Sequence, residues 1–170
     1  MKPTGPQGLN ASRSLVAQVG ALEVPSAAKP LVIDAIGQQW LWRFEYPGGR
    51  PGDRVYSYGE LVVPVDTTIV LRLTSTDVMH RWFIPALGGQ VDAVPGKTAE
   101  TWFRADREGV YRGQSTFFSG SAYSAMRAWV RVVSPDAYRQ YVLQQKRDLA
   151  AAQGYVQRKV TQSAIPGLEP

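Results

Sequence analysis

The sequence predicts an all-β fold, an antiparallel β-sandwich followed by one α-helix near the C-terminus. Short apolar segments with period-two alternation recur along the middle of the chain, and turns containing Gly, Pro or Asp separate them. After residue 134 the apolar spacing changes to that of a helix. With 170 residues, 44% of them hydrophobic, the chain can bury one core. These observations predict a single folded domain with extensions at both ends.

The strand pattern is clearest at residues 39–46, where Trp40, Trp42, Phe44 and Tyr46 alternate with other side chains. We expect these four aromatic side chains on one half-buried face. The segment ELVVPVD carries a proline within its strand pattern, which favours a position at the edge of a sheet. The remaining expected strands are 31–37, 67–75, 81–86, 99–105, 109–115 and 127–134.

The helix is predicted to begin directly after Ser134, which is a suitable N-cap. Pro135 fits the first helical position, and the carboxylate of Asp136 favours the positive end of the helix dipole. The chain therefore divides into an extended N-terminal arm at 1–30, a sandwich domain at 31–134, and a helix with a tail at 135–170. The apolar side chains expected on one helix face are Tyr138, Tyr141, Val142 and Leu149.

Composition excludes several classes of function. The net charge is +5, but Lys and Arg are dispersed and form no block, so we expect no nucleic-acid binding and a surface suited to an anionic partner or membrane face. The absence of cysteine excludes disulfides and thiolate ligands. No apolar run approaches a membrane span and no export signal is evident, so neither is expected within these residues.

A catalytic site is not expected. A Ser-His-Asp triad could combine His80 and Asp77 with Ser75, Ser115 or Ser119, but no nucleophile-elbow motif supports it. Paired carboxylates for acid and base catalysis and a glycine-rich phosphate loop are also missing from the sequence. We therefore expect no activity of the chain on its own.

Five motifs occur in one order along the chain: GQQWLWRFEY (37–46), DVMH (77–80), IPALG (84–88), DAVPG (92–96) and EGVY (108–111). Together they resemble the extracytoplasmic cupredoxin domain of subunit II of haem-copper terminal oxidases, over about residues 31–142. The resemblance implies a cupredoxin-like Greek-key β-sandwich on the periplasmic face of a respiratory membrane. It also implies, as partners, the catalytic subunit I and other membrane subunits, through which the chain would associate with the membrane.

In the cytochrome c-oxidising members of that family, the domain holds a binuclear copper centre with two bridging thiolates. In this chain, serine occupies the two positions at which those members have the bridging cysteines. Phenylalanine occupies the position of their glutamate, and tyrosine occupies the position of their second histidine. A serine hydroxyl is hard and neutral and cannot replace a bridging thiolate, so the binuclear centre is expected to be absent. The positions that the resemblance assigns to this site are His80, Ser115, Phe117, Ser119, Tyr123 and Met126.

The altered loop at 113–126 resembles subunit II of the quinol-oxidising members, in which this domain is a structural element without copper. The leading hypothesis is therefore a non-catalytic subunit without a cofactor that caps the catalytic subunit and stabilises the assembly. One alternative is a soluble copper-handling or electron-transfer protein that binds a single copper ion through His80 and Met126. Another is a free-standing interaction module. The residues expected at the partner interface are Trp40, Trp42, Asp92, Pro95 and Lys97.

Overall fold

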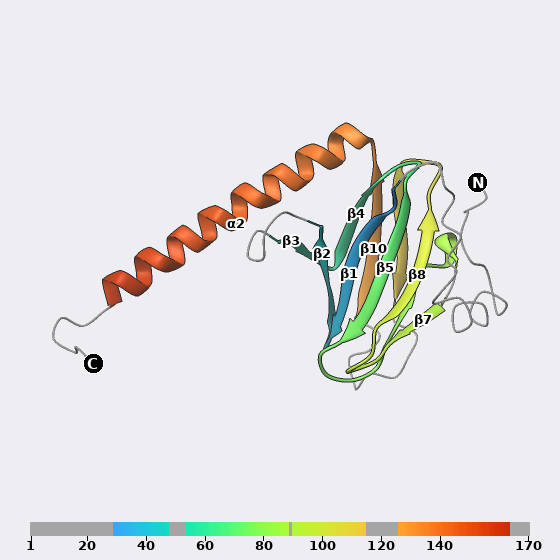
Figure 1. Ribbon diagram of the computed structural model, residues 1–170, viewed down its shortest axis with the longest axis horizontal. Coiled ribbons are helices and arrows are strands. Elements are labelled where there is room, and N and C mark those ends of the chain that lie inside the picture. The colour runs from blue at the N-terminus through green and yellow to red at the C-terminus, as the bar shows by residue number, and fades with distance from the viewer. Residues whose placement is uncertain (1–28, 48–53, 89, 115–125, 164–170) are drawn as a thin grey trace.

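The computed structural model describes residues 29–47, 54–88, 90–114 and 126–163. Figure 1 gives the arrangement of their helices and strands. The first five strands are β1 (Leu31–Gln38), β2 (Leu41–Tyr46), β3 (Val55–Tyr58), β4 (Glu60–Pro64) and β5 (Thr68–Ser75). The later elements are β6 (His80–Phe83), the 3-10 turn η1 (Pro85–Leu87), β7 (Gln90–Ala93), β8 (Ala99–Arg104), β9 (Gly109–Gln114), β10 (Arg127–Val133) and the helix α2 (Pro135–Ser163).

Two sheets form the body of the domain (Figure 1). One contains five strands in the order β3-β2-β1-β5-β8, and the other contains three in the order β4-β10-β9. Strands β6 and β7 form a separate antiparallel hairpin. The predicted β-sandwich with a C-terminal helix is confirmed, and the proline-containing strand β4 lies at a sheet edge as expected.

The sheets are mixed, although the sequence predicted antiparallel pairing throughout. Strand β1 runs parallel to β5, and β10 runs parallel to β4. Parallel neighbours require a long connection, and here the chain passes through other strands between the two members of each pair. The strands β3 and β7 were not expected from the sequence. Each has four residues and is defined by the neighbour with which it pairs.

The burial of the aromatic side chains in β2 confirms most of what was predicted for this strand. Trp42, Phe44 and Tyr46 of β2 are buried, as their alternation predicted. Trp40 departs from the expected face, because it precedes the strand in a turn and its side chain is 42% exposed. The buried apolar residues that extend this core on β5 and β10 are Ile69, Leu71, Leu73, Val130 and Val132. Burying a side chain of this size contributes about 1.5–3 kcal/mol relative to leaving it exposed.

The hairpin β6-β7 is joined to the sandwich by aromatic packing. The ring of Trp82 in β6 lies edge-on to Trp42 and Phe44, with centroid distances of 5.4 and 5.7 Å. Strand β9 approaches the same hairpin at Gly113, where no side chain would fit beside the backbone of Phe83. One large side chain and one close backbone contact therefore help to hold the hairpin against the sandwich.

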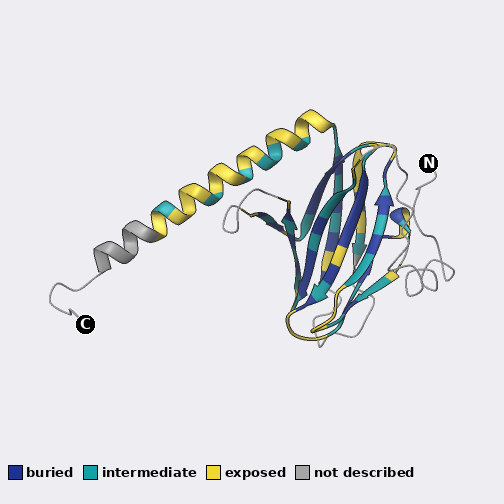
Figure 2. Ribbon diagram, viewed as in Figure 1, coloured by how far each residue is buried: buried dark blue, intermediate teal, exposed yellow. Residues whose placement is uncertain are grey.

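The start of α2 agrees with the sequence analysis. The backbone N–H of Ala137 donates a hydrogen bond to the Ser134 hydroxyl, which is the predicted N-cap. Tyr138 and Tyr141 pack against the ring of Tyr46, with centroid distances of 6.3 and 6.0 Å. The helix then continues to Ser163, past the region where the sequence pattern weakens. It diverges from the sandwich, and most of its residues from 143 to 156 are exposed (Figure 2).

Candidate functional site

His80 lies at the first position of β6 and is fully buried. Its Nε2 is 2.7 Å from Oδ1 of Asp77. Because a carboxylate only accepts hydrogen bonds, Nε2 carries the proton and Nδ1 presents a lone pair in the neutral imidazole. This Nδ1 has no hydrogen-bond partner among the described residues. Within the described part of the chain, the histidine is therefore held through one nitrogen only.

Asp77 organises the loop that precedes β6. Its Oδ2 accepts a hydrogen bond from the backbone N–H of Gln39 at 2.6 Å, and its Oδ1 accepts one from the N–H of Val78 at 2.6 Å. Partial burial alone would raise the pKa of this carboxyl. The hydrogen bonds from His80 and the two backbone groups outweigh that effect and lower the pKa to about 2. The loop is thus tied to the β1-β2 turn by an ionised carboxylate.

The imidazole of His80 is enclosed on two sides. The Trp42 ring lies edge-on to it at a centroid distance of 6.2 Å. On another side, a Cβ at Gly37 would come within 2.8 Å of His80 Cδ2, so only glycine leaves room for the ring. The indole N–H of Trp42 is also buried without a partner among the described residues. Two polar atoms in this enclosure, Nδ1 of His80 and Nε1 of Trp42, are therefore without a partner in the part of the chain that the structure describes.

The geometry around Asp77 does not form a hydrolytic triad. In a triad the histidine lies between the serine and the carboxylate. Here Asp77 lies in the middle, because the Ser75 hydroxyl is 3.2 Å from its Oδ1 and donates to the carbonyl of Val78. Ser115 and Ser119, the other serines considered, lie outside the described residues. His80 and Asp77 are in contact, but no described serine is placed to be activated by the histidine.

Only two of the six positions expected around the copper site are described. Met126 immediately precedes β10 and is fully buried in the hydrophobic core. The described residues contain no group of three or more His, Cys, Asp and Glu that could hold a metal ion. The four expected positions outside the described residues are Ser115, Phe117, Ser119 and Tyr123.

The available donors do not fit the binuclear copper centre that the resemblance implies. A delocalised copper pair requires soft, anionic bridging ligands, which in proteins are cysteine thiolates. The chain contains no cysteine at any position. His80 offers one neutral nitrogen and Met126 one neutral thioether, and neither can bridge two copper ions as a thiolate does. No electron-transfer step through such a centre follows from these residues.

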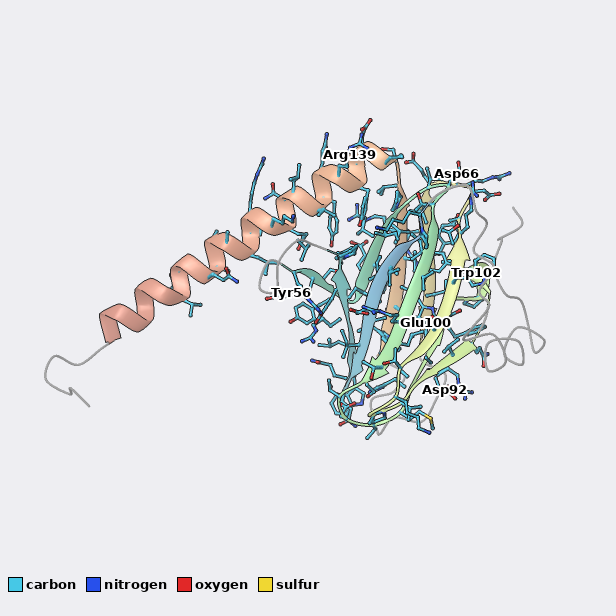
Figure 3. The ribbon with its side chains drawn as sticks, in the orientation of Figure 1. Tyr56, Asp66, Asp92, Glu100, Trp102 and Arg139 are labelled. Atoms are coloured by element: carbon cyan, nitrogen blue, oxygen red, sulfur yellow. The ribbon has the colours of Figure 1, made fainter. Side chains whose placement is uncertain are left out.

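The expected partner interface lies close to His80, because His80 and Ala93 are paired in the β6-β7 hairpin. Asp92 is held in this hairpin by Arg81, whose Nε and Nη2 donate to the two carboxylate oxygens at 2.6 and 2.9 Å. That bond raises the pKa of the Arg81 guanidinium. Figure 3 shows Asp92 beside β7, at the end of the sandwich away from the first turn of α2.

The turn after β7 is exposed and is closed by a backbone hydrogen bond. Gly96 has a φ of 73°, and the N–H of Lys97 donates to the carbonyl of Val94 at 3.2 Å. This places Pro95 and Lys97 at the surface. Trp42 was also expected at the interface, but its side chain is fully buried and cannot contact another chain. Among the two tryptophans, only Trp40 presents surface to a partner.

The lowered pKa of Asp77 predicts a loss of stability in acid. The pKa of an aspartate side chain in the unfolded chain is about 3.9, whereas the pKa of Asp77 in the folded chain is about 2. Between these two pH values the folded state therefore binds fewer protons than the unfolded state. The stabilisation of the folded state by the ionised carboxylate is complete above about pH 4 and is lost as the pH falls toward about 2. Because the carboxylate is partly exposed, we expect a loss of about 1–2 kcal/mol, measured by urea unfolding.

The matched variant for this measurement is Asp77→Asn. It cannot ionise, so the part of the acid dependence that arises from Asp77 should disappear, while the rest of the pH profile remains. A variant that keeps the full acid dependence would show that Asp77 does not stabilise the fold through its charge.

Within the described residues, no helix is both long and apolar enough to cross a membrane. The family model for "Cytochrome C oxidase subunit II, periplasmic domain" matches residues 53–133. Cytochrome c oxidase subunit 2 of Cereibacter sphaeroides is 35% identical, over 72% of this chain and 51% of that protein. The probable cytochrome c oxidase subunit 2 of Rickettsia prowazekii is 31% identical, over 66% of this chain and 41% of that protein. The chain thus spans about half the length, or less, of these relatives.

Solved structures give a more complete match. The periplasmic domain of subunit II of cytochrome oxidase from Bradyrhizobium japonicum is 31% identical, with a TM-score of 0.65, over 71% of this chain and 97% of that one. A subunit II of cytochrome c oxidase in a mixed disulfide with a thioredoxin-like protein is 33% identical, with a TM-score of 0.62, over 72% and 97% of the two chains. This chain therefore belongs to the family of cytochrome c oxidase subunit II periplasmic domains, which lie on the extracytoplasmic side of the membrane.

Proposed function

We propose that this chain is a non-catalytic subunit II domain of a respiratory haem-copper oxidase complex, without the binuclear copper centre. The observation that carries the proposal is the complete absence of cysteine, because no other side chain supplies the bridging anions that the copper pair requires. The domain would act structurally at the extracytoplasmic face of the catalytic subunit. In this it would be most like the quinol-oxidising type, which the loop at 113–126 resembles.

The surroundings of His80 support a structural role for the retained histidine. Its hydrogen bond to Asp77, together with the bond from the Gln39 N–H to the same carboxylate, links the start of β6 to the turn between β1 and β2. The histidine therefore holds two loops together at the end of the domain where the metal would otherwise lie. Such a contact stabilises the fold without any metal.

The surface next to this end supplies a contact region for partner subunits. The hydrogen-bonded turn with Pro95 and Lys97 follows the β6-β7 hairpin, and the exposed Trp40 lies in the turn to which Asp77 is bound. An ordered loop loses little conformational entropy when it binds, which favours a permanent interface. We infer that this region contacts the catalytic subunit of the complex.

Copper titration tests the proposal. After incubation with Cu(I) or Cu(II) and desalting, we expect the purified chain to retain less than about 0.1 copper per chain, because a neutral His-Met pair is a weak ligand set. Elemental analysis measures the copper, and absorption and paramagnetic resonance spectra report its state. Co-purification of a tagged chain with haem-bearing membrane subunits is the complementary test of the structural role.

One observation favours a second candidate, a mononuclear copper site. The Nδ1 atom of His80 is buried without a partner among the described residues, and its lone pair is the form that binds a metal. Retention of about one copper per chain, lost in His80→Ala and in Met126→Leu, would replace the structural proposal with this one. Met79→Leu is the matched control, because it removes a neighbouring thioether and should leave such a site intact.

A further inference from the structure

The outer face of the three-stranded sheet β4-β10-β9 carries arginine on two neighbouring strands (Figure 1). Alternate residues of β10 are buried in the core, and Arg127 and Trp129 belong to the opposite face. On β9, the exposed Val110 and Arg112 lie on this same outer face, because Tyr111 between them belongs to the core. We call Val110, Arg112, Arg127 and Trp129 the arginine face.

Arg112 is held by an aromatic ring and not by an acid. Its guanidinium lies over the ring of Trp129, with 4.8 Å between Cζ and the ring centroid, and the two residues are direct neighbours in the β9-β10 register. Among the described residues, its N–H groups have no hydrogen-bond acceptor. A guanidinium held in this way keeps its donors for a carboxylate, and it loses little conformational freedom on binding one.

Arg127 is the second free cation of this face. It forms no hydrogen bond or ion pair with the residues that the structure describes. Arg127 is paired with Gln114 in the register, so Arg112, two residues before Gln114, is its diagonal neighbour on the same face. Diagonal neighbours have their Cβ atoms about 7–8 Å apart. Carboxylates at positions i and i+2 of an extended chain are about 7 Å apart and match this spacing.

The third arginine on this side of the sheet, Arg131, is already paired. Its Nε and Nη2 donate to the two carboxylate oxygens of Glu60 at 3.0 and 3.1 Å. Its guanidinium also lies 5.7 Å from the centroid of the Tyr141 ring in α2. The neighbour of Arg131 on β9 is Val110, whose side chain is 51% exposed. Between Arg131 and the two free arginines, the face therefore presents an apolar side chain to solvent.

The distribution of charge gives a ligand on this face a direction. The exposed acidic residues Asp106 and Glu108 lie in the turn before β9, at the Val110 end of the arginine face. Carboxylates of a ligand would be repelled at that end and attracted toward Arg112 and Arg127. A bound segment would therefore place an apolar side chain on Val110 and its acidic side chains beyond it.

The number of free charges favours one kind of ligand. Lipid surfaces attract clusters of about four to eight basic residues, and nucleic acids require a basic patch or stripe. The arginine face offers only Arg112 and Arg127 as free cations among the described residues. A second copy of the chain, docked through the same face, would bring these positive charges against each other. A short acidic segment of another chain pairs with both arginines and leaves no excess charge.

We propose that the arginine face binds an extended acidic segment of another protein chain. An apolar side chain of this segment packs on Val110, and carboxylates two and four residues later pair with Arg112 and Arg127. This site goes beyond the proposed function, and it operates whether or not the domain retains copper.

Three synthetic peptides test the proposal by nuclear magnetic resonance with the purified, isotope-labelled full chain. The first has Val, Glu and Glu at two-residue steps, and we expect it to bind and to shift the side-chain Nε–H resonances of Arg112 and Arg127. The second has Gln in place of both Glu residues and should bind at least about tenfold more weakly. The third has the two Glu residues adjacent, which places them on opposite faces of an extended chain, and should bind at least about fivefold more weakly.

Arg112→Gln and Arg127→Gln should each weaken binding of the first peptide by at least about fivefold. Arg147→Gln is the matched control, because it removes the same charge from an exposed position on α2. It should leave binding within about twofold, and circular dichroism should report the same fold for all three variants.

The proposal is overturned if the first peptide does not bind, if either of the other peptides binds equally well, or if Arg147→Gln weakens binding as much as Arg127→Gln. It is also overturned if the chain instead associates with anionic phospholipid vesicles, or forms a dimer in sedimentation, and Arg127→Gln abolishes that association.

Discussion

Gly113→Ala is expected to lower the free energy of unfolding by about 3 kcal/mol, an effect near the upper end for a single added methyl group. A Cβ at this position would lie 2.0 Å from the carbonyl oxygen of Phe83 and 2.9 Å from its carbonyl carbon. Both atoms belong to the backbone, so no side-chain rotation can relieve the contact. Strand β9 would have to move away from the β6-β7 hairpin. Urea unfolding measures the loss, and hydrogen exchange should report faster exchange in β6.

Gly96→Ala separates this effect from the general cost of replacing a glycine. Gly96 has a φ of 73°, which an L-residue adopts at a cost of about 1 kcal/mol, but a Cβ there would meet no atom within 4 Å. We therefore expect a loss of about 1 kcal/mol for this variant. If Gly113→Ala costs no more than Gly96→Ala, the close approach of β9 to Phe83 is not present in solution.

The sequence predicted those strands and the helix whose conformation depends mainly on their own residues. Alternation in β2 placed Trp42, Phe44 and Tyr46 in the core, and capping at Ser134 located the start of α2. Strand β7 and the parallel pairing of β1 with β5 depend on neighbours that are distant in the chain. Such partner choice is decided by tertiary packing, which local periodicity does not report.

Only part of the candidate site could be predicted from the sequence. The resemblance identified His80, but the sequence analysis considered Asp77 only as a possible member of a catalytic triad. Its role as the acceptor for both His80 and the Gln39 N–H depends on bringing together two loops that are 38 residues apart. A hint was present in the spacing, because an acid three residues before a histidine can reach its ring across a short loop. Gly37, which leaves room for that ring, gave no such signal.

Trp82→Ala is expected to lower the free energy of unfolding by about 3–5 kcal/mol, as for other large aromatic side chains removed from a core. Trp82 is 3% exposed, and its ring contacts both Trp42 and Phe44 of the opposing sheet. Together with the edge-on contact between Trp42 and His80, these aromatic contacts join the β6-β7 hairpin to the five-stranded sheet. Urea unfolding gives the magnitude, and near-ultraviolet circular dichroism should report a weakened signal from the aromatic cluster.

Trp102→Ala is the matched control, since it removes the same side chain from a half-buried position on β8 (Figure 3). We expect a loss of about 1 kcal/mol there. Should Trp82→Ala prevent folding, Trp82→Phe retains a ring and should cost less. Equal losses for the two alanine variants would mean that Trp82 does not anchor the hairpin.

Because His80 begins β6, and Pro95 and Lys97 follow β7, a loosened hairpin would disorder both the histidine enclosure and the proposed partner surface. Hydrogen exchange in β6 and β7 should therefore rise more than in β1 and β5.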